Sequence, residues 1–140
     1  MAQAFRDVGF NISCVTEQFP GRSTVPDEEI IQWLSSRTGK DGVWITADED
    51  AQKTHAKLIL QEGISSLWIF RSRKGLSALQ ELQLVAFVIK KVEELVIASE
   101  HPVHFRASFN GERPRLMRLN NTIMDEKPDW RNVPLRMPSP

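Results

Sequence analysis

The chain of 140 residues contains a single cysteine, Cys14. One cysteine excludes an internal disulfide framework and every zinc site built from several cysteines, and it is typical of a protein from a reducing compartment. The 18 Lys and Arg residues balance the 18 Asp and Glu residues, so no overall charge excess draws the chain to nucleic acid or to an anionic membrane. Any electrostatic binding must therefore come from a local cluster of charge.

Long apolar runs are missing as well. The densest run, at 82–89, is interrupted by Gln83 and followed by two lysines, whereas a membrane-spanning helix needs about 20 apolar residues. Arg6 and Asp7 interrupt the first ten residues, where a signal peptide needs an unbroken apolar segment. We therefore expect a cytoplasmic protein.

Motifs built on glycine are also absent. The chain has no Gly-x-Gly-x-x-Gly or Walker loop and no Gly-x-Ser-x-Gly elbow, which removes the main support for a nucleotide-cofactor enzyme or a serine hydrolase. With 41% hydrophobic and 26% charged residues, the composition is that of an ordinary globular protein. The chain is too short for two independent cores. We expect one domain over residues 1–119 and a loosely ordered, proline-rich tail over 120–140.

Apolar residues in the first half of the chain switch repeatedly between the spacing of helices and that of strands. Such alternation predicts an α/β fold, with a parallel sheet that carries helices on its faces. The expected elements are a helix at 2–8, a strand at 10–15, a helix at 27–37, a strand at 43–46, a helix at 50–62 and a strand at 66–70.

A long helix is expected at 76–99, because apolar residues recur there every three or four positions. Its main stripe is Leu76, Leu79, Leu82, Val85, Ile89, Val92 and Val96. A second apolar set lies off this stripe and consists of Leu84, Phe87, Val88, Leu95 and Ile97. A helix that is apolar on two sides needs either deep burial or a partner protein. The sequence leaves both alternatives open.

Local basic charge follows two of the predicted strands. A hairpin is expected at 102–119, since Asn110-Gly111 is a strong two-residue turn signal and alternating apolar residues precede it. That turn would set Arg106 opposite Arg115, so either the register differs or an anion such as RNA phosphate, or an acidic partner, relieves the repulsion. The candidate RNA-binding residues after the strand at 66–70 are Arg71, Arg73 and Lys74.

Two runs of acidic residues lie where an α/β sheet places its ligand site. They are Asp-Glu-Glu at 27–29, which opens the helix at 27–37, and Asp-Glu-Asp at 48–50, which follows the strand at 43–46. Carboxylates brought together there repel one another unless a divalent cation neutralises them, and Mg²⁺ or Mn²⁺ prefers oxygen ligands. If the two runs meet, they predict a metal site whose natural chemistry is phosphodiester hydrolysis.

Both runs also have a purely structural explanation. Asp27 is a favoured N-cap residue, and the acids that follow it suit the first turn of a helix. Thr46-Ala47-Asp48-Glu49 matches the capping box. Helix capping and metal binding therefore remain alternatives for each run.

The histidines give weaker signals. His55 lies among lysine and threonine in a predicted helix, which favours a solvated helix face. His101 and His104 are three residues apart but lack a third ligand, so they give little support to a zinc site.

Taken in order, the segments of the first half resemble PIN-like domains. The similarity lies in a short helix ending at Gly9, the strand FNISCV, a D-E-E-I motif that opens a helix at 27–30, and the strand VWITADED, which ends in T-x-D-x-D. The chain is most similar to the PIN-like toxins of VapBC-type toxin–antitoxin modules, over residues 2–71 and more loosely through Leu119. The resemblance implies a three-layer domain with a mostly parallel sheet and a C-terminal hairpin.

The resemblance also implies a Mg²⁺- or Mn²⁺-dependent endoribonuclease that a cognate antitoxin blocks. By motif, Asp27, Asp48 and Asp50 would be the catalytic metal ligands, with Thr46 and Glu28 in support and water as the nucleophile. Such domains usually open with a strand that carries a further metal-binding aspartate, and no residue of this chain matches it. We therefore expect a PIN-like domain that lacks the usual first strand.

Three functions follow from this interpretation, and one of them, a DNA-repair or RNA-maturation nuclease of the same fold, differs from the first below only in its substrate. The first is a ribonuclease toxin that hydrolyses RNA. The second is a catalytically incomplete PIN-like protein in which the acids only cap helices, while the helix at 76–99 binds an antitoxin or a second copy of the chain. Loss of metal-dependent RNA cleavage on Asp48→Asn would favour the first, and co-purification of a small partner without ion binding would favour the second.

Overall fold

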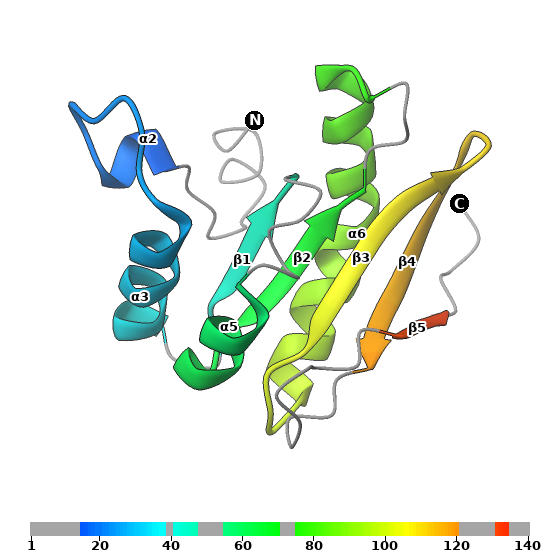
Figure 1. The fold of residues 1–140 in the computed structure, drawn as a ribbon. Coiled ribbons are helices and arrows are strands. Elements are labelled where there is room, and N and C mark those ends of the chain that lie inside the picture. Colours follow the sequence, from blue (N-terminus) through cyan, green and yellow to red (C-terminus); the bar gives the residue numbers. More distant parts are fainter. Residues whose placement is uncertain (1–14, 39–40, 48–54, 71–74, 121–130, 135–140) are drawn as a thin grey trace.

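The computed structural model has helices arranged around one five-stranded sheet (Figure 1). The structure describes residues 15–38, 41–47, 55–70, 75–120 and 131–134. The elements, in chain order, are α2 (Val15–Gln18), α3 (Asp27–Thr38), β1 (Val43–Thr46), α5 (Ala56–Glu62), β2 (Ser65–Ile69), α6 (Ala78–Ala98), β3 (His104–Asn110), β4 (Arg113–Asn120) and β5 (Arg131–Pro134).

The strands lie in the order β1-β2-β3-β4-β5. β1 and β2 are parallel, as are β2 and β3, whereas β4 is antiparallel to both of its neighbours. Four of the five strands therefore run in the same direction (Figure 1). The prediction of an α/β fold with a mostly parallel sheet is confirmed, and the sheet is open.

Helix α6 covers one face of the sheet. Its buried residues Leu84, Val85, Val88, Val92 and Val96 pack against Leu67, Ile69, Phe105, Ala107 and Leu116 from β2, β3 and β4. Leu84 and Val88 come from the second apolar set and are fully buried, so deep burial explains much of that set. Among the described residues, the large apolar side chains left exposed are Leu79 and Ile97. They lie eighteen positions apart on one helix, about 27 Å, and therefore form no continuous patch.

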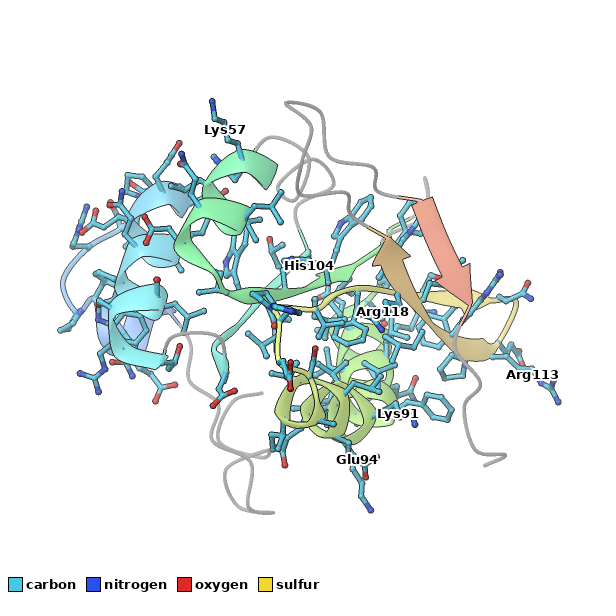
Figure 2. The ribbon with its side chains drawn as sticks, turned by 90° about the horizontal axis from the view of Figure 1, so that it is seen from below. Lys57, Lys91, Glu94, His104, Arg113 and Arg118 are labelled. Carbon is cyan, nitrogen blue, oxygen red and sulfur yellow. The ribbon has the colours of Figure 1, made fainter. Side chains whose placement is uncertain are left out.

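Helices α3 and α5 cover the opposite face, over β1. The buried cluster on this face consists of Ile31, Trp44, Ile59 and Ile64. Because side chains alternate along a strand, Trp44 faces α3 and α5 while its neighbours Val43 and Ile45 face the core under α6. Figure 2 shows α6 on one side of the sheet and α3 and α5 on the other. The described elements thus form three layers.

Several predicted element boundaries hold closely where the structure describes them, but the helix predicted at 50–62 begins only at Ala56. The strand at 43–46 is β1, the helix at 27–37 is α3 with one further residue, and the strand at 66–70 is β2 displaced by one residue. α5 ends at Glu62 as predicted, because Gly63 has a left-handed φ of 67° and its N–H donates to the Ile59 carbonyl at 3.1 Å. The predicted helix at 2–8 lies outside the described residues, as does the strand at 10–15 except for Val15, which is helical.

The hairpin of β3 and β4 forms with a register that differs from the prediction. Gly111 and Glu112, not Asn110 and Gly111, are the two turn residues, and Gly111 has a φ of 66°. A left-handed first turn position suits a two-residue hairpin, and glycine adopts it without strain. Arg106 consequently pairs with Met117. The predicted pairing of Arg106 with Arg115 is wrong, so the two arginines are not directly opposed across the hairpin.

Strand β5 lies within the segment 120–140, which the sequence assigned to a loose tail. It pairs antiparallel with residues 117–120 of β4. Pro114 pairs with Phe109 of β3 and precedes the stretch that β5 covers. β4 is thus an interior strand over its second half, and its proline falls in the half that β5 does not reach.

Candidate functional site

Helix α3 places its acidic first turn at the carboxyl end of β1. The start of α3 and the arrowhead of β1 lie at the same end of the sheet (Figure 1). The N–H groups of Glu29 and Ile30 donate to the Pro26 carbonyl at 3.1 and 3.2 Å, so Pro26 occupies the N-cap position and Asp27 is the first helical residue. The predicted N-cap role of Asp27 is therefore wrong. Its carboxylate still lies where the helix dipole favours negative charge.

His55 contacts the acids of α3 and was missed by the sequence analysis. Its Nε2 lies 3.3 Å from Asp27 Oδ2 and its Nδ1 lies 3.7 Å from Glu28 Oε1. The ring also packs edge-on against Trp44 of β1, with 6.3 Å between ring centroids. With only 14% of its side chain exposed, His55 is not on a solvated helix face as predicted.

The start of α5 explains why the prediction for His55 failed. The sequence suggested a helix from residue 50, in which His55 would be one polar position among several. In the structure the helix begins at Ala56 and His55 is the N-cap residue. A residue that precedes a helix is directed by the incoming chain rather than by the helical period, and no periodic signal could have found it.

The remaining acids of the proposed metal site lie outside the described residues. Thr46, the last residue of β1, shares the face of Trp44 because the two positions are separated by one residue. Asp48 and Asp50 fall in the segment 48–54, which the structure does not describe. The same holds for the candidate RNA-binding residues Arg71, Arg73 and Lys74.

The described residues supply part of a site for Mg²⁺ or Mn²⁺. Asp27 and Glu28 offer the oxygen donors that these ions prefer, and both converge on His55. Within the described part of the chain, however, no group of three or more His, Cys, Asp or Glu side chains is placed to hold a metal. The donor chemistry fits a divalent cation only if the acids at 48–50 join Asp27.

A second polar group is buried within the sheet. Ser66 of β2 and His104 of β3 pair in register, and a hydrogen bond of 2.9 Å joins Ser66 Oγ to His104 Nδ1. Burial, with a smaller contribution from the positive charge of Arg118, lowers the pKa of His104 from 6.5 to about 4. His104 is thus a neutral structural residue at pH 7, whereas His101 is exposed.

Next to this pair lies a cluster of two aromatic rings and an arginine. Trp68 of β2 pairs in register with Arg106 of β3. The Arg106 Cζ atom lies 4.9 Å from the centre of the Trp68 ring and 4.0 Å from that of Phe70. The two rings are perpendicular, with centroids 5.7 Å apart. Neither ring was singled out from the sequence, because both looked like ordinary core residues of an apolar strand.

Comparisons with known proteins add no relative. No family model, no curated protein and no solved structure matches the chain. None of the helices in the described segments has the length and apolar character required to span a membrane.

Proposed function

We propose that this chain is a metal-dependent endoribonuclease with a PIN-like domain, the toxin component of a VapBC-type module. One observation supports this proposal above the others. Asp27 contacts His55, and the His55 ring lies against Trp44, two residues before the end of β1. The carboxylate of α3 is therefore linked to the strand from which the chain continues into Asp48 and Asp50.

In this proposal Asp27, Asp48 and Asp50 would hold Mg²⁺ or Mn²⁺. When bound, such an ion lowers the pKa of a water molecule and stabilises the departing oxygen of the phosphodiester. His55, packed against Trp44, restricts the direction of the Asp27 carboxylate, as partners of metal ligands generally do.

The other proposed residues assist around this centre. Glu28 extends from the same first turn of α3 and adds negative charge beside His55. Thr46 at the end of β1 is proposed to support the acids that follow it. The basic residues Arg71, Arg73 and Lys74 are proposed to contact the RNA backbone, and a cognate antitoxin would block access to the site.

Metal-dependent cleavage of RNA tests the proposal. We expect the purified chain to cleave single-stranded RNA with Mn²⁺ or Mg²⁺, and Asp48→Asn and Asp27→Asn each to lower the rate on the order of 100-fold or more, because each removes a ligand of the same ion. Initial rates from gel-resolved, end-labelled RNA measure this effect. Glu94→Gln is the matched control, since Glu94 is an exposed carboxylate of α6, across the sheet from α3 and α5 (Figure 2). Undiminished cleavage by Asp48→Asn would contradict the proposal.

A second candidate is a non-catalytic module that binds an antitoxin or another copy of the chain. The contact between Asp27 and His55 is equally compatible with it, because a histidine ring can hydrogen-bond to a carboxylate without any metal. Calorimetry with Mn²⁺ separates the two candidates. Heat of ion binding that disappears in Asp48→Asn supports the nuclease, whereas no binding together with co-purification of a small partner supports the module.

A further inference from the structure

The Trp68, Phe70 and Arg106 cluster lies on a face of the sheet that α3 and α5 cover only in part. Trp44 of β1 pairs with Ser66 of β2, so the two side chains project to the same face, the one that carries α3 and α5. Trp68 lies two residues after Ser66 and therefore projects to that face as well. These helices lie over β1, and no described helix covers β3 and β4 on that side (Figures 1 and 2). We call this region the open face.

Two hydrogen-bond donors on the open face have no acceptor among the described residues. Trp68 is 6% exposed, and among the described residues neither its Nε1 nor the Nε of Arg106 has a hydrogen-bond partner. Buried donors in folded proteins are almost always paired, because an unpaired one loses its bond to water without compensation. A ligand that brings acceptor oxygens would restore both bonds.

Charge on the open face favours an anionic ligand. The positions of β3 and β4 that share this face carry Arg106, Arg113 and Arg115 and no carboxylate within the described residues. Arg106 and Arg115 lie on the same face of the neighbouring strands β3 and β4, and burial, and then the positive charge of Arg115, lower the pKa of Arg106. A bound anion offsets this positive charge, and arginine is suited to phosphate because its planar fork of N–H donors fits two oxygens at once.

We propose that Trp68, Arg106 and Arg115 form a site on the open face that binds a phosphate group of single-stranded RNA. The site lies beside the end of β1, since Thr46 pairs with Trp68 and Trp68 with Arg106. Asp27 of the proposed metal site contacts His55, which packs on Trp44 of the same face. The choice of RNA as the source of the phosphate rests on the proposed function, whereas the phosphate chemistry rests on the donors and the charge.

The flexible side chain of Arg106 makes the two rings accessible. The residue is only half-buried, and its guanidinium lies over the Trp68 and Phe70 rings, so its rotation toward a phosphate would expose the ring faces that it covers. The uncovered faces of Trp68 and Phe70 are then free to stack against a base, which favours single strands over a duplex.

Binding of RNA in EDTA tests the site without cleavage. The readout is the fluorescence anisotropy of a fluorescein-labelled single-stranded RNA, titrated with the protein at several salt concentrations. Arg106→Gln should raise the dissociation constant about tenfold and lower the slope of log K against log salt by about one, because it removes one phosphate contact. The dissociation constant of Arg106→Lys should lie between those of the unchanged chain and of Arg106→Gln. Trp68→Phe keeps an aromatic ring but removes the N–H, and it should weaken binding several-fold.

Arg37→Gln is the matched control. Arg37 also lies over a tryptophan, with 5.5 Å from its Cζ to the Trp33 ring centre. It occupies an exposed position of α3 and is not on the open face. Arg37→Gln changes the net charge by the same amount as Arg106→Gln, and it should leave RNA binding unchanged. Equal weakening by Arg37→Gln and Arg106→Gln would overturn the proposal in favour of nonspecific attraction. Thermal melts followed by circular dichroism establish whether each variant is folded. If Trp68→Phe does not fold, the RNA affinity of Arg106→Lys tests the site instead.

Two further arms separate this inference from its rivals and from the proposed nuclease. Arg106-dependent binding to anionic phosphatidylserine vesicles or to polyglutamate, without RNA binding, would overturn the RNA assignment. Asp48→Asn should bind RNA in EDTA like the unchanged chain. If neither the unchanged chain nor any variant cleaves RNA but binding still depends on Arg106, the inference stands and the nuclease proposal fails. If the chain cleaves RNA and Arg106→Gln alters neither cleavage nor binding, the nuclease proposal stands and the inference fails.

Discussion

At the scale of the residue, His104 shows how a strand position decides the charge of a side chain. The histidine alternates with Phe105 and so faces away from the core under α6, yet its side chain is almost fully buried and bonded to Ser66. Burial disfavours the charged imidazolium, which is why the pKa falls to about 4. In the sequence this histidine looked like half of a weak metal pair with His101.

The lowered pKa of His104 predicts a pH dependence of stability. The unfolded chain takes up a proton near the ordinary pKa of 6.5, and the folded chain does so only near 4. The neutral histidine therefore contributes fully above pH 6.5, and stability falls as the pH drops toward 4, by about 3 kcal/mol over the whole interval.

Urea unfolding at pH 7 and at pH 4.5 measures this dependence. His104→Gln keeps a polar partner for Ser66 but removes the titrating group. Between pH 7 and pH 4.5 this variant should therefore lose less stability than the unchanged chain, by most of the about 3 kcal/mol given above. His101→Gln serves as the control because His101 is exposed. An identical pH dependence in the unchanged chain and in His104→Gln would show that His104 is not the group responsible.

Candidate site residues can be proposed from the sequence only where their chemistry alone identifies them. The acids at 27–29 and 48–50 stand out because carboxylates in series after strand and turn signals suggest a ligand site. His55 and Trp68 could not be found in this way. Their roles come from neighbours far away in the chain, Asp27 in one case and Arg106 in the other.

At the scale of the element, α6 begins at a capping box that fixes its first turn. The N–H of Gln80 donates to Ser77 Oγ at 3.1 Å, and the N–H of Ser77 donates to Gln80 Oε1 at 2.9 Å. Both donors would otherwise lack partners at the helix start. The sequence placed the helix start within two residues of this position without using the motif.

Loss of the cap should destabilise the protein measurably. We expect Ser77→Ala to lower the free energy of unfolding by about 1 kcal/mol, because the N–H of Gln80 loses its acceptor. Ser36→Ala is the control: this exposed serine inside α3 donates only to the carbonyl of Trp33, and its replacement should cost less than about 0.5 kcal/mol. Equal effects in urea unfolding would argue against the capping box.

The hairpin shows a limit of prediction at this scale. Asn-Gly is the commonest two-residue turn signal, but the chain turns one residue later, at Gly111 and Glu112. Moving the turn by one residue changes each cross-strand partner by two positions, so side chains keep their faces but exchange neighbours. The faces could therefore be predicted, whereas the pairing of Arg106 could not.

At the scale of the whole molecule, the core under α6 joins the long helix to three strands. Leu84 is fully buried within it and Leu79, one and a half turns earlier, is 63% exposed. The hydrophobic pattern assigned Leu79 to the main stripe and Leu84 to the second set. The packing of α6 on the sheet reverses their importance.

This pair of leucines gives a direct test of the packing. Leu84→Ala should lower the free energy of unfolding by about 3 kcal/mol, because it removes buried methyl groups and leaves a cavity. Leu79→Ala makes the same chemical change at an exposed position and should alter the free energy by less than about 0.5 kcal/mol. Comparable losses for both variants would mean that α6 docks through another side.

The sequence by itself determined where α3, β1, β2 and α6 lie and how α5 ends, because these depend on local spacing and on residues such as Gly63. Only the tertiary structure decided the contact of Asp27 with His55, the register of the hairpin and the position of Arg106 over two rings. The physical reason is that such contacts join residues distant in the chain, and their partners are set by how layers pack rather than by any local period.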